Sequence, residues 1–266
     1  MKIIVCVKQV PDTSGKVAVN PDGTLDRASM QTITNPDDLN AVEAALTLKD
    51  ETGCEVVVVT MGPPPAEGML REILARGADK AVLVSGREFG GSDTYATSQI
   101  LAAAINRIGV EKDDIGMCGR QAIDGDTAQG GPQIAEKLGL PQISYAAEIK
   151  KDGDTITVQR MLEDGYMTIK VQTPCLVTCI KELNEPRYMS VGGIFEAYSK
   201  PMEVFDYNAL KDDPLIDATT IGLKGSPTNI LTSFTPPQKG AGMMLEGDGK
   251  ETCEQLAAIL AKKHII

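Results

Sequence analysis

The sequence is poor in the residues that many enzymes use for acid–base and metal chemistry. Among its 266 residues there is no tryptophan, and the single histidine, His264, lies close to the C-terminus. Without a second histidine, and with no nucleophile near the first in the sequence, a Ser-His-Asp triad and a histidine-ligated zinc site are not expected. Function is therefore expected to depend on something other than catalysis by histidine.

Cysteine is also scarce and shows no functional spacing. There is no CxxC pair and no zinc-binding pattern, and the closest pair lies in PCLVTCI, which is typical of a strand. We expect reduced thiols buried in strands. The six residues are Cys6, Cys54, Cys118, Cys175, Cys179 and Cys253.

Basic residues are outnumbered by acidic ones, and long apolar runs are absent. The chain has 26 basic and 37 acidic residues, for a formal net charge of −11, so nucleic acid is not an expected partner. No apolar run approaches the roughly 20 residues that span a bilayer. The N-terminal segment MKIIVCVKQV is too short in apolar residues for a signal peptide, and we interpret it as a first strand. We expect a cytoplasmic protein without membrane insertion.

What is present in the first half is an alternation of strand and helix patterns. β-branched runs at 2–7, 54–60, 80–85 and 114–118 predict strands. Helices are predicted from Asn35–Pro36 to Gly53, over 69–77, from Ser92–Asp93 to 108, and over 133–138. This order predicts an α/β fold with a mostly parallel, doubly wound, Rossmann-like nucleotide-binding sheet.

The pattern changes after Pro141. Strand-like segments at 144–150, 155–162, 166–172 and 175–180 are joined by hairpin signals, which predicts an antiparallel extension of the sheet. Residues 212–250 are rich in Gly, Pro, Thr and Asp, and an apolar pattern with Leu256, Ile259 and Leu260 then predicts a final helix. We expect an α/β domain over 1–211 and a C-terminal arm over 212–266 that packs on a partner; a disordered tail is the alternative.

Ligands of an open parallel sheet bind past the carboxyl ends of its strands. The loops there are VKQVPDTSG, TMGPPP, GREFGGSDTYAT and CGRQAIDGDTAQGGPQ, with neither a GxGxxG nor a GxxxxGK[ST] motif. In the fourth loop, glycines at 125, 130 and 131 allow phosphate to approach the backbone, and the following helix offers free amides. Ordinary loop composition is an equally good explanation of these glycines.

The third loop has a similar makeup. Ser92, Asp93, Thr94 and Thr97 surround a helix start, where hydroxyls and amides suit an anion, although for this loop taken alone a simple helix cap at Ser92 and Asp93 is the favoured explanation. Asp93 is expected to point outward as part of that cap. The fourth-loop carboxylates Asp124 and Asp126 have no further ligand cluster, so no metal site is expected.

At these loops the sequence closely resembles the β-subunit of electron-transfer flavoproteins. The resemblance covers essentially the whole chain and is carried by VKQVPD (7–12), NPDDLNAVEAAL (35–46), TMGP (60–63), RQAIDGDTAQGGPQIAE (120–136) and NEPRYMS (184–190). It implies a heterodimer whose α-subunit holds one FAD, and a β-subunit with a nucleotide-binding α/β fold and a C-terminal arm on its partner.

The resemblance also implies a cofactor site. The positions that match the family's nucleotide contacts are Cys6, Asn35, Pro36, Asp37, Asp38, Met61, Gly119, Arg120, Gln121, Ala122, Ile123, Asp124, Gly125, Asp126, Thr127, Ala128, Gln129, Gly130, Gly131, Pro132, Gln133 and Ile134. Simpler members hold AMP there, and bifurcating members hold a second FAD. DGDTAQGGP and GGSDTYATS make this chain similar to the bifurcating members, so FAD is expected, with Thr94 and Thr97 holding its second phosphate. One departure is Gly131, where many relatives have a larger apolar residue.

In such relatives NADH delivers hydride to the β-subunit flavin. One electron then goes to ferredoxin or flavodoxin, and the other reaches an acyl-CoA dehydrogenase through the FAD of the α-subunit. The segment NEPRYMSVGGIF matches the family's docking loop, which predicts that Met189, Val191 and Ile194 contact the dehydrogenase. An ordinary core-facing apolar turn is the alternative for these three. For the whole chain, the alternatives are a non-bifurcating AMP-holding subunit, a nucleotide-sensing α/β module and a hydrolase of adenine nucleotides.

Overall fold

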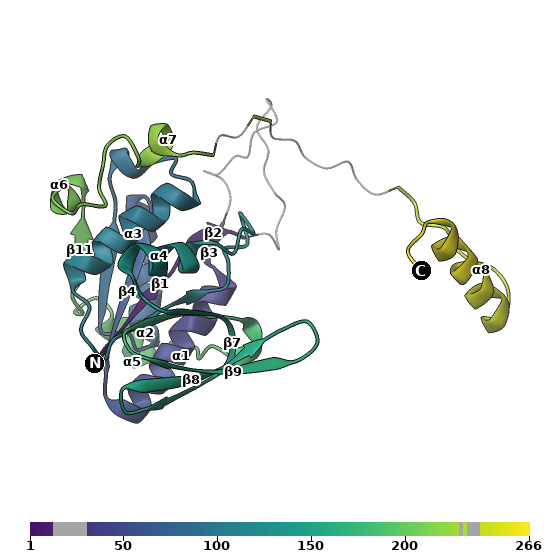
Figure 1. Ribbon diagram of the computed structural model, residues 1–266, viewed down its shortest axis with the longest axis horizontal. Helices are drawn as coiled ribbons and strands as arrows, with labels where there is room; N and C mark the ends of the chain where they lie inside the picture. Colours follow the sequence, from purple (N-terminus) through teal and green to yellow (C-terminus); the bar gives the residue numbers. More distant parts are fainter. Residues whose placement is uncertain (13–30, 229–230, 233–239) are drawn as a thin grey trace. The chain divides into compact units, whose positions relative to one another are not determined.

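The computed structural model describes residues 1–12, 31–228, 231–232 and 240–266. They belong to two compact units, an α/β unit that continues through residue 228 and a C-terminal unit that begins at residue 231. Within the described residues, the α/β unit contains a nine-stranded sheet and a two-stranded sheet (Figure 1).

The large sheet confirms the predicted fold class. Its order is β11 (Met202–Phe205), β5 (Lys80–Val84), β4 (Glu55–Met61), β1 (Lys2–Cys6), β6 (Ile115–Gly119), β10 (Cys175–Cys179), β7 (Gln142–Asp152), β8 (Thr155–Met161) and β9 (Tyr166–Gln172). Neighbours from β11 to β7 pair in parallel, and β7, β8 and β9 pair antiparallel. The small sheet pairs β2 (Gln9–Pro11) with β3 (Thr32–Thr34).

One strand of the predicted antiparallel extension is placed differently. β10 lies between β6 and β7 and pairs in parallel with both, so the prediction is wrong for this strand. All five residues of β10 are buried, whereas β7 and β9 have exposed positions and most residues of β8 are only partly buried. A short, fully buried apolar run is typical of a central parallel strand, and this pattern outweighs the hairpin signals before it.

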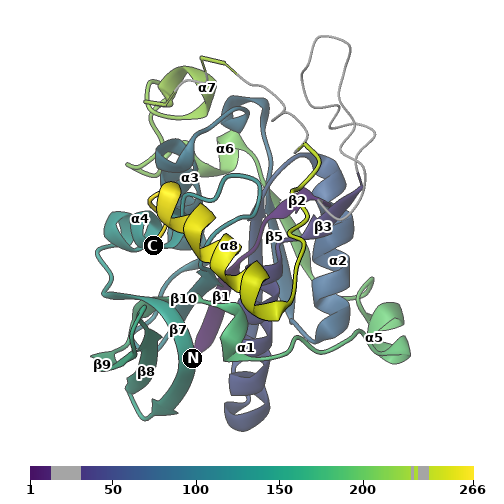
Figure 2. The same ribbon diagram turned by 90° about the vertical axis from the view of Figure 1, so that its right-hand side faces the viewer.

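Four helices cover the two faces of the sheet (Figure 2). Buried residues of α1 (Pro36–Thr52) and α2 (Glu67–Arg76) share a core with Ile3 and Val5 of β1. Buried residues of α3 (Thr94–Ile108) and α4 (Gly130–Leu138) share the other core with Ile4 and Cys6. Alternate side chains of one strand therefore serve two cores, as a doubly wound sheet requires.

The helix boundaries follow the predicted signals in three of the four cases. α1 begins at Pro36 and ends before Gly53, whose φ of 71° suits glycine. The Asp93 carboxylate accepts a hydrogen bond from the Ala96 amide at 3.0 Å and caps α3. α4 begins at Gly130 instead of near residue 133, because glycine and proline, which favour a loop in sequence, are tolerated in a first helical turn.

Residues 212–228, assigned to the arm from composition, run beside α3. Gln99 of α3 donates hydrogen bonds to the Leu215 carbonyl and the Thr220 hydroxyl, and the Thr228 amide donates to Asp93. This part contains the short helix α7 (Gly222–Gly225), and the short helix α6 (Tyr207–Leu210) precedes it. Single 3-10 turns occur at η1 (Pro64–Ala66), η2 (Arg87–Phe89) and η3 (Lys181–Leu183).

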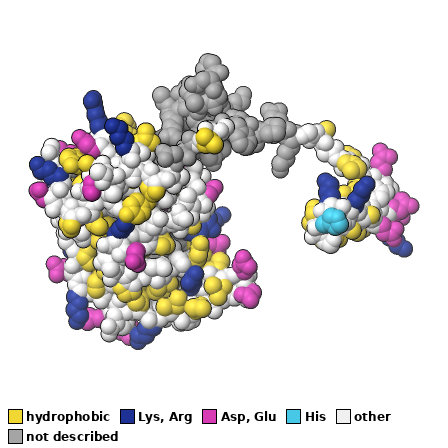
Figure 3. All heavy atoms as spheres, turned by 45° about the horizontal axis from the view of Figure 1, so that its top comes forward, with side chains coloured by type: hydrophobic (Ala, Val, Ile, Leu, Met, Phe, Trp, Pro, Cys, Tyr) yellow, Lys and Arg dark blue, Asp and Glu magenta, His cyan; other side chains and the backbone are white. Residues whose placement is uncertain are grey.

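The C-terminal unit contains the predicted final helix, α8 (Gly249–Lys262). Asp248 and Glu251 form a capping box at its start, and none of its residues is buried. Figure 3 shows acidic side chains gathered on one side of this unit and hydrophobic ones elsewhere on it.

The free cysteines follow the prediction except at one position. Cys6, Cys54, Cys118, Cys175 and Cys179 are buried, but Cys253 is exposed because it lies on α8 and not in the sheet. Across the described part of the chain, no helix has both the length and the apolar character to cross a membrane.

Candidate functional site

The carboxyl ends of β1 and β6 meet the first turn of α1. A Cβ atom at Gly119 would lie 2.6 Å from the Asp37 carbonyl carbon and from the Asp38 amide nitrogen. Only glycine therefore permits this approach of β6 to α1, and the two elements form the base of the site.

Asp38 connects these elements. One carboxylate oxygen accepts the Gly119 amide and the other accepts the Lys8 amide, each at 2.8 Å. Its carboxyl is buried, and burial raises its pKa to about 7 against the opposing effect of the two amides. Since both oxygens are occupied by the chain itself, Asp38 organises the site and has little capacity left for a ligand.

Asn35 performs a second tethering role. Its position before α1 is the one predicted, but its side chain makes no capping hydrogen bond. The fully buried amide instead donates to the Gln121 carbonyl at 2.8 Å and accepts from the Ile123 amide at 3.1 Å. Asn35 therefore fixes the fourth loop, residues 119–129, against the start of α1.

The fourth-loop carboxylates are engaged inside the protein. Lys8 donates to both oxygens of Asp124 at 2.7 Å, and the Gln121 side chain donates to Asp126 at 2.8 Å. Among the described residues, no group of three or more His, Cys, Asp or Glu side chains could hold a metal ion. The residue that sequence analysis missed here is Lys8; an ammonium directly after the first strand and an acid-rich loop were the available signals.

The backbone of the same loop is strained. Asp126 and Ala128 have φ values of 50° and 52°, in the left-handed region that side chains with a Cβ atom disfavour. Such strain persists where surrounding contacts fix the chain, and it concentrates at ligand-binding loops. The tethers through Asn35 and Lys8 supply that fixation.

The two glycines that begin α4 have different environments. A Cβ atom at Gly131 would lie 2.6 Å from Cγ2 of Thr178 and 2.7 Å from the Cys118 sulfur, so α4 packs directly on β6 and β10. A Cβ atom at Gly130 would meet nothing within 4 Å, and the same holds for Gly125. Space therefore lies beside Gly130, where the first-turn amides of α4 have no acceptor within their helix.

The third and fourth loops come together at this space. The Thr94 hydroxyl lies 3.4 Å from the side-chain oxygen of Gln129. Thr97 is one turn further along α3, on the same helix face, and is half-buried. Asp93 is held by the Ala96 and Thr228 amides, as expected for a cap residue.

The remaining predicted positions complete the edge. Asp37 pairs with Arg120 at 3.3 Å, and burial raises the pKa of Asp37 while Arg120 opposes that rise. Cys6 ends β1, and burial raises the pKa of its thiol to about 12, so it is not a nucleophile at neutral pH. Met61 ends β4 and is half-buried. The predicted residues from β1, β4, α1, β6 and the fourth loop thus lie along one edge of the sheet.

The predicted docking residues form a different surface around α5 (Val191–Glu196). Val191 is 74% exposed and Ile194 43% exposed, so they do not face the core of this chain. Tyr188, Phe195 and Tyr198, which the sequence analysis did not include, are exposed beside them. Their signal was the aromatic residue at the end of VGGIF and a tyrosine three residues away on either side of that segment.

The fold and the site at the carboxyl ends of β1, β4 and β6 define a class of protein. It is the class of doubly wound α/β proteins that have a glycine-containing ligand loop past the strand ends. Residues 22–210 match the electron transfer flavoprotein domain. The chain belongs to the electron transfer flavoprotein family and is a β-type subunit of an electron-transfer complex.

Individual relatives match over their full length. The chain is 68% identical to the acryloyl-CoA reductase electron transfer subunit gamma of Anaerotignum propionicum, with 100% of both chains covered. It is 52% identical to subunit CarD of the caffeyl-CoA reductase-Etf complex of Acetobacterium woodii, again over 100% of both chains. It is 49% identical, with the same coverage, to the electron transfer flavoprotein subunit beta of Clostridium acetobutylicum.

Proposed function

We propose that this chain binds FAD at the carboxyl edge of its sheet and takes part in electron bifurcation from NADH. The observation that carries the proposal is the meeting of the third and fourth loops at Thr94 and Gln129. AMP needs donors for one phosphate, whereas FAD carries a diphosphate and needs donors for two. Two adjacent helix starts, one with the hydroxyls of Thr94 and Thr97 and the other with the uncapped first-turn amides of α4, fit the larger group.

In this proposal, different residues bind the two phosphates and neutralise the nearby carboxylates. The first-turn amides of α4 hold one phosphate, and Thr94 and Thr97 hold the other. Lys8 and Gln121 neutralise or occupy the loop carboxylates, which would otherwise repel the diphosphate. A flavin in this place supplies hydride acceptance and one-electron transfer, so the protein needs to supply only position and electrostatics. The scarcity of histidine and metal ligands agrees with this division.

The partners follow from the same proposal. An α-subunit with its own FAD completes the heterodimer, one electron goes to ferredoxin or flavodoxin, and the other goes to an acyl-CoA dehydrogenase. Two relatives are named as parts of acyl-CoA reductase systems, acryloyl-CoA reductase and caffeyl-CoA reductase, which supports this acceptor class. The exposed residues Met189, Val191 and Ile194 form the dehydrogenase-docking surface, and α8 packs on the α-subunit.

The test is a flavin count on the co-expressed heterodimer. The absorption spectrum, with FAD and AMP quantified after extraction, should give about two FAD per heterodimer and no stoichiometric AMP. NADH should reduce the additional flavin. One FAD with one AMP would contradict bifurcation and favour the AMP-holding alternative.

A further inference from the structure

The docking surface is carried by a segment with little secondary structure of its own. Residues 184–200 contain only the six-residue helix α5, and Tyr188 and Phe195 on it are 93% and 78% exposed. Ala197 is the one residue of this segment buried in a core of the sheet, and the other side chains are exposed or partly exposed. The conformation of the segment therefore depends largely on hydrogen bonds and ion pairs to the rest of the unit.

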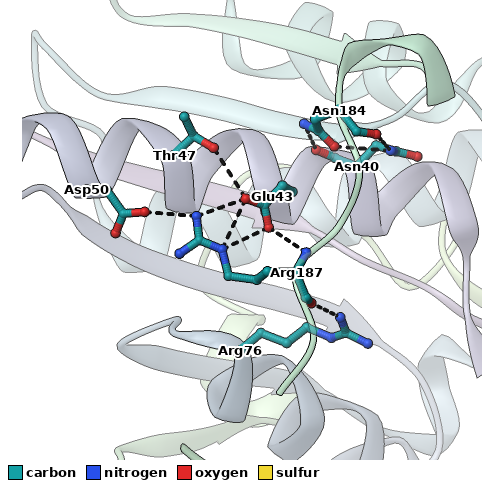
Figure 4. A network of polar contacts seen from close by, with 7 residues as sticks. All are labelled: Asn40, Glu43, Thr47, Asp50, Arg76, Asn184 and Arg187. Carbon is teal, nitrogen blue, oxygen red and sulfur yellow. Dashed lines mark hydrogen bonds and ion pairs between the residues drawn. The ribbon is translucent and has the colours of Figure 1, made fainter. Parts of the chain in front are cut away.

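The N-terminal end of the segment is fixed on α1 by Glu43 (Figure 4). Both carboxylate oxygens of Glu43 accept from the Arg187 guanidinium at 2.8–3.0 Å, and one also accepts the Arg187 backbone amide at 2.9 Å. Glu43 is buried, and Thr47 lies 3.4 Å from its carboxylate. A forked, charge-assisted pair of this kind fixes both distance and orientation.

Further contacts reinforce this end. The side chains and carbonyls of Asn40 and Asn184 exchange hydrogen bonds at 2.8–3.1 Å. Arg76 of α2 donates to the Arg187 carbonyl, and Asp50 accepts from the Arg187 guanidinium at 2.8 Å. Arg187 thus contacts two helices through its side chain and its backbone (Figure 4).

The C-terminal end is fixed on α2. Arg71 donates to the Ala197 carbonyl at 2.8 Å, and Lys200 donates to the Leu74 and Ala78 carbonyls at 2.9 and 2.8 Å. A Cβ atom at Gly193 would overlap the Ala75 carbonyl oxygen, so α5 lies directly against α2. The exposed residues therefore lie between two anchored ends.

We propose that Glu43, acting through Arg187, is the positioning residue of the docking segment; this rests on the proposed function. Neither side chain belongs to the cofactor edge or to the exposed docking residues. Fixing the segment before the dehydrogenase arrives removes an ordering cost from complex formation. Loss of the Glu43 charge should therefore weaken docking and leave flavin reduction intact.

The test compares Glu43→Gln with a matched control in the complete heterodimer. The control, Asp114→Asn, breaks another ion pair of a buried carboxylate, between Asp114 and Lys2 at 2.9 Å, at the amino-terminal ends of β6 and β1. The acceptor is the acryloyl-CoA reductase of Anaerotignum propionicum, whose electron transfer subunit is 68% identical to this chain. Amide hydrogen exchange of residues 184–198 is measured in the free heterodimer.

For Glu43→Gln we expect a roughly tenfold rise in the half-saturating reductase concentration, with the rate at saturation and the NADH reduction of flavin within about twofold of wild type. Exchange of 184–198 should accelerate. Asp114→Asn should lower thermal stability but change neither the half-saturating reductase concentration nor the hydrogen exchange of residues 184–198. Arg187→Lys keeps the positive charge but loses the bidentate guanidinium contact with Glu43. Its half-saturating reductase concentration and its exchange rate should lie between those of wild type and Glu43→Gln, and it serves as the folded variant if Glu43→Gln does not fold.

The outcomes distinguish the positioning role of Glu43 from the proposed function of the chain. Unchanged exchange or unchanged half-saturation in Glu43→Gln, with normal wild-type turnover, would overturn the positioning role. So would an equal change in Asp114→Asn, which would attribute the effect to general destabilisation. A wild-type heterodimer that transfers no electrons to any acyl-CoA dehydrogenase or reductase would contradict the proposed function itself, whereas the exchange measurement needs no acceptor.

Discussion

Gly130 and Gly131 are adjacent glycines with different physical reasons for lacking a side chain. Gly130→Val adds bulk where the chain itself has no atom within 4 Å, so the fold should persist while nucleotide is lost. Gly131→Ala places a Cβ atom 2.6 Å from Thr178, and overpacking of this kind costs roughly 1–3 kcal/mol. Extraction with chromatography measures nucleotide content, and thermal unfolding measures stability. Wild-type nucleotide content in Gly130→Val would contradict the placement of the phosphate.

Asp38 predicts a pH dependence of stability. Its folded-state pKa, raised by burial to about 7, exceeds that of an unfolded aspartate, about 3.9. The folded form thus binds the proton more tightly, so the contribution of Asp38 is fully present below pH 4 and is lost as the pH rises through 7. The full loss is about 4 kcal/mol, since one pKa unit corresponds to about 1.4 kcal/mol.

Asp38→Asn removes this titration. It also leaves one of the two amides at Lys8 and Gly119 facing a side-chain NH₂ group, so the variant should be less stable at every pH. The difference in unfolding temperature between wild type and variant should be largest at pH 5 and shrink toward pH 8. A difference independent of pH would contradict the raised pKa.

At single residues, the sequence indicated which loop to consider as a site but not which hydrogen bonds its side chains make. The composition of the fourth loop indicated a site, and the structure places that loop at the carboxyl edge. The tethering by Asn35 and Asp38 was not predictable, because a side chain that caps a helix and one that bonds a distant loop have the same sequence context. Long-range partners, 81 residues apart for Asp38 and Gly119, leave no local signal.

The start of α3 should distinguish FAD from AMP. Replacing Thr94 and Thr97 by valine removes two hydroxyls at the third loop and leaves the fourth loop unchanged. Each hydroxyl-to-phosphate hydrogen bond contributes on the order of 1.5–3 kcal/mol, so FAD should bind roughly a hundredfold or more weaker while AMP binding barely changes. FAD and AMP content of the purified heterodimer, together with NADH-driven flavin reduction, measure this.

A matched control replaces Thr157 and Thr168, which lie on β8 and β9, by valine. This double variant should retain wild-type flavin. Wild-type flavin content in the Thr94 and Thr97 variant would refute the diphosphate assignment. A parallel loss of FAD and AMP would instead indicate that α3 itself had been disturbed.

α5 predicts a separate effect on electron delivery. Val191→Asp introduces a charge at a position that is 74% exposed, so the fold should tolerate it. An apolar anchor in a partner pocket contributes on the order of 2 kcal/mol, and acceptor turnover at limiting dehydrogenase should fall by more than tenfold. NADH reduction of flavin should continue. Unchanged turnover would favour the alternative that Val191 is not a docking residue.

Elements with local signals were predictable from sequence. α1 has a first-turn proline and a glycine after its last turn, and its bounds agree with the prediction. The partners of β10 carried no such signal, since a buried apolar run does not encode which strands it joins. Turn signals between the strands predicted that β7, β8 and β9 are neighbours. No such signal predicted that β10 lies between β6 and β7.

At the scale of the whole molecule, the features to explain are the fourth loop, its paired acids and the exposed surfaces. The described residues contain a strained glycine-containing loop, paired acids and no candidate metal cluster. In the proposed function the flavin supplies the redox chemistry, so the chain needs to supply only position and electrostatics. The same proposal assigns a partner to each of two exposed parts, the docking surface around α5 and the helix α8.

The C-terminal unit predicts how the subunits stay together. α8 has 14 residues with a capping box and no buried residue. Isolated helices of this length are marginal in water, so α8 needs an apolar surface to cover Leu256, Ile259 and Leu260. We expect that surface on the α-subunit. Ile259→Asp with Leu260→Asp should then weaken the heterodimer at least tenfold, and leave the unfolding temperature of the α/β unit unchanged.

Glu254→Gln with Lys262→Gln on the same helix is the control and should retain wild-type association. Dissociation constants from sedimentation at a series of concentrations measure the effect. The apolar substitutions remove no buried side chain of this chain, because none of the residues of α8 is buried. Equal association of both variants and wild type would contradict the assignment of α8 to the α-subunit and favour a free tail.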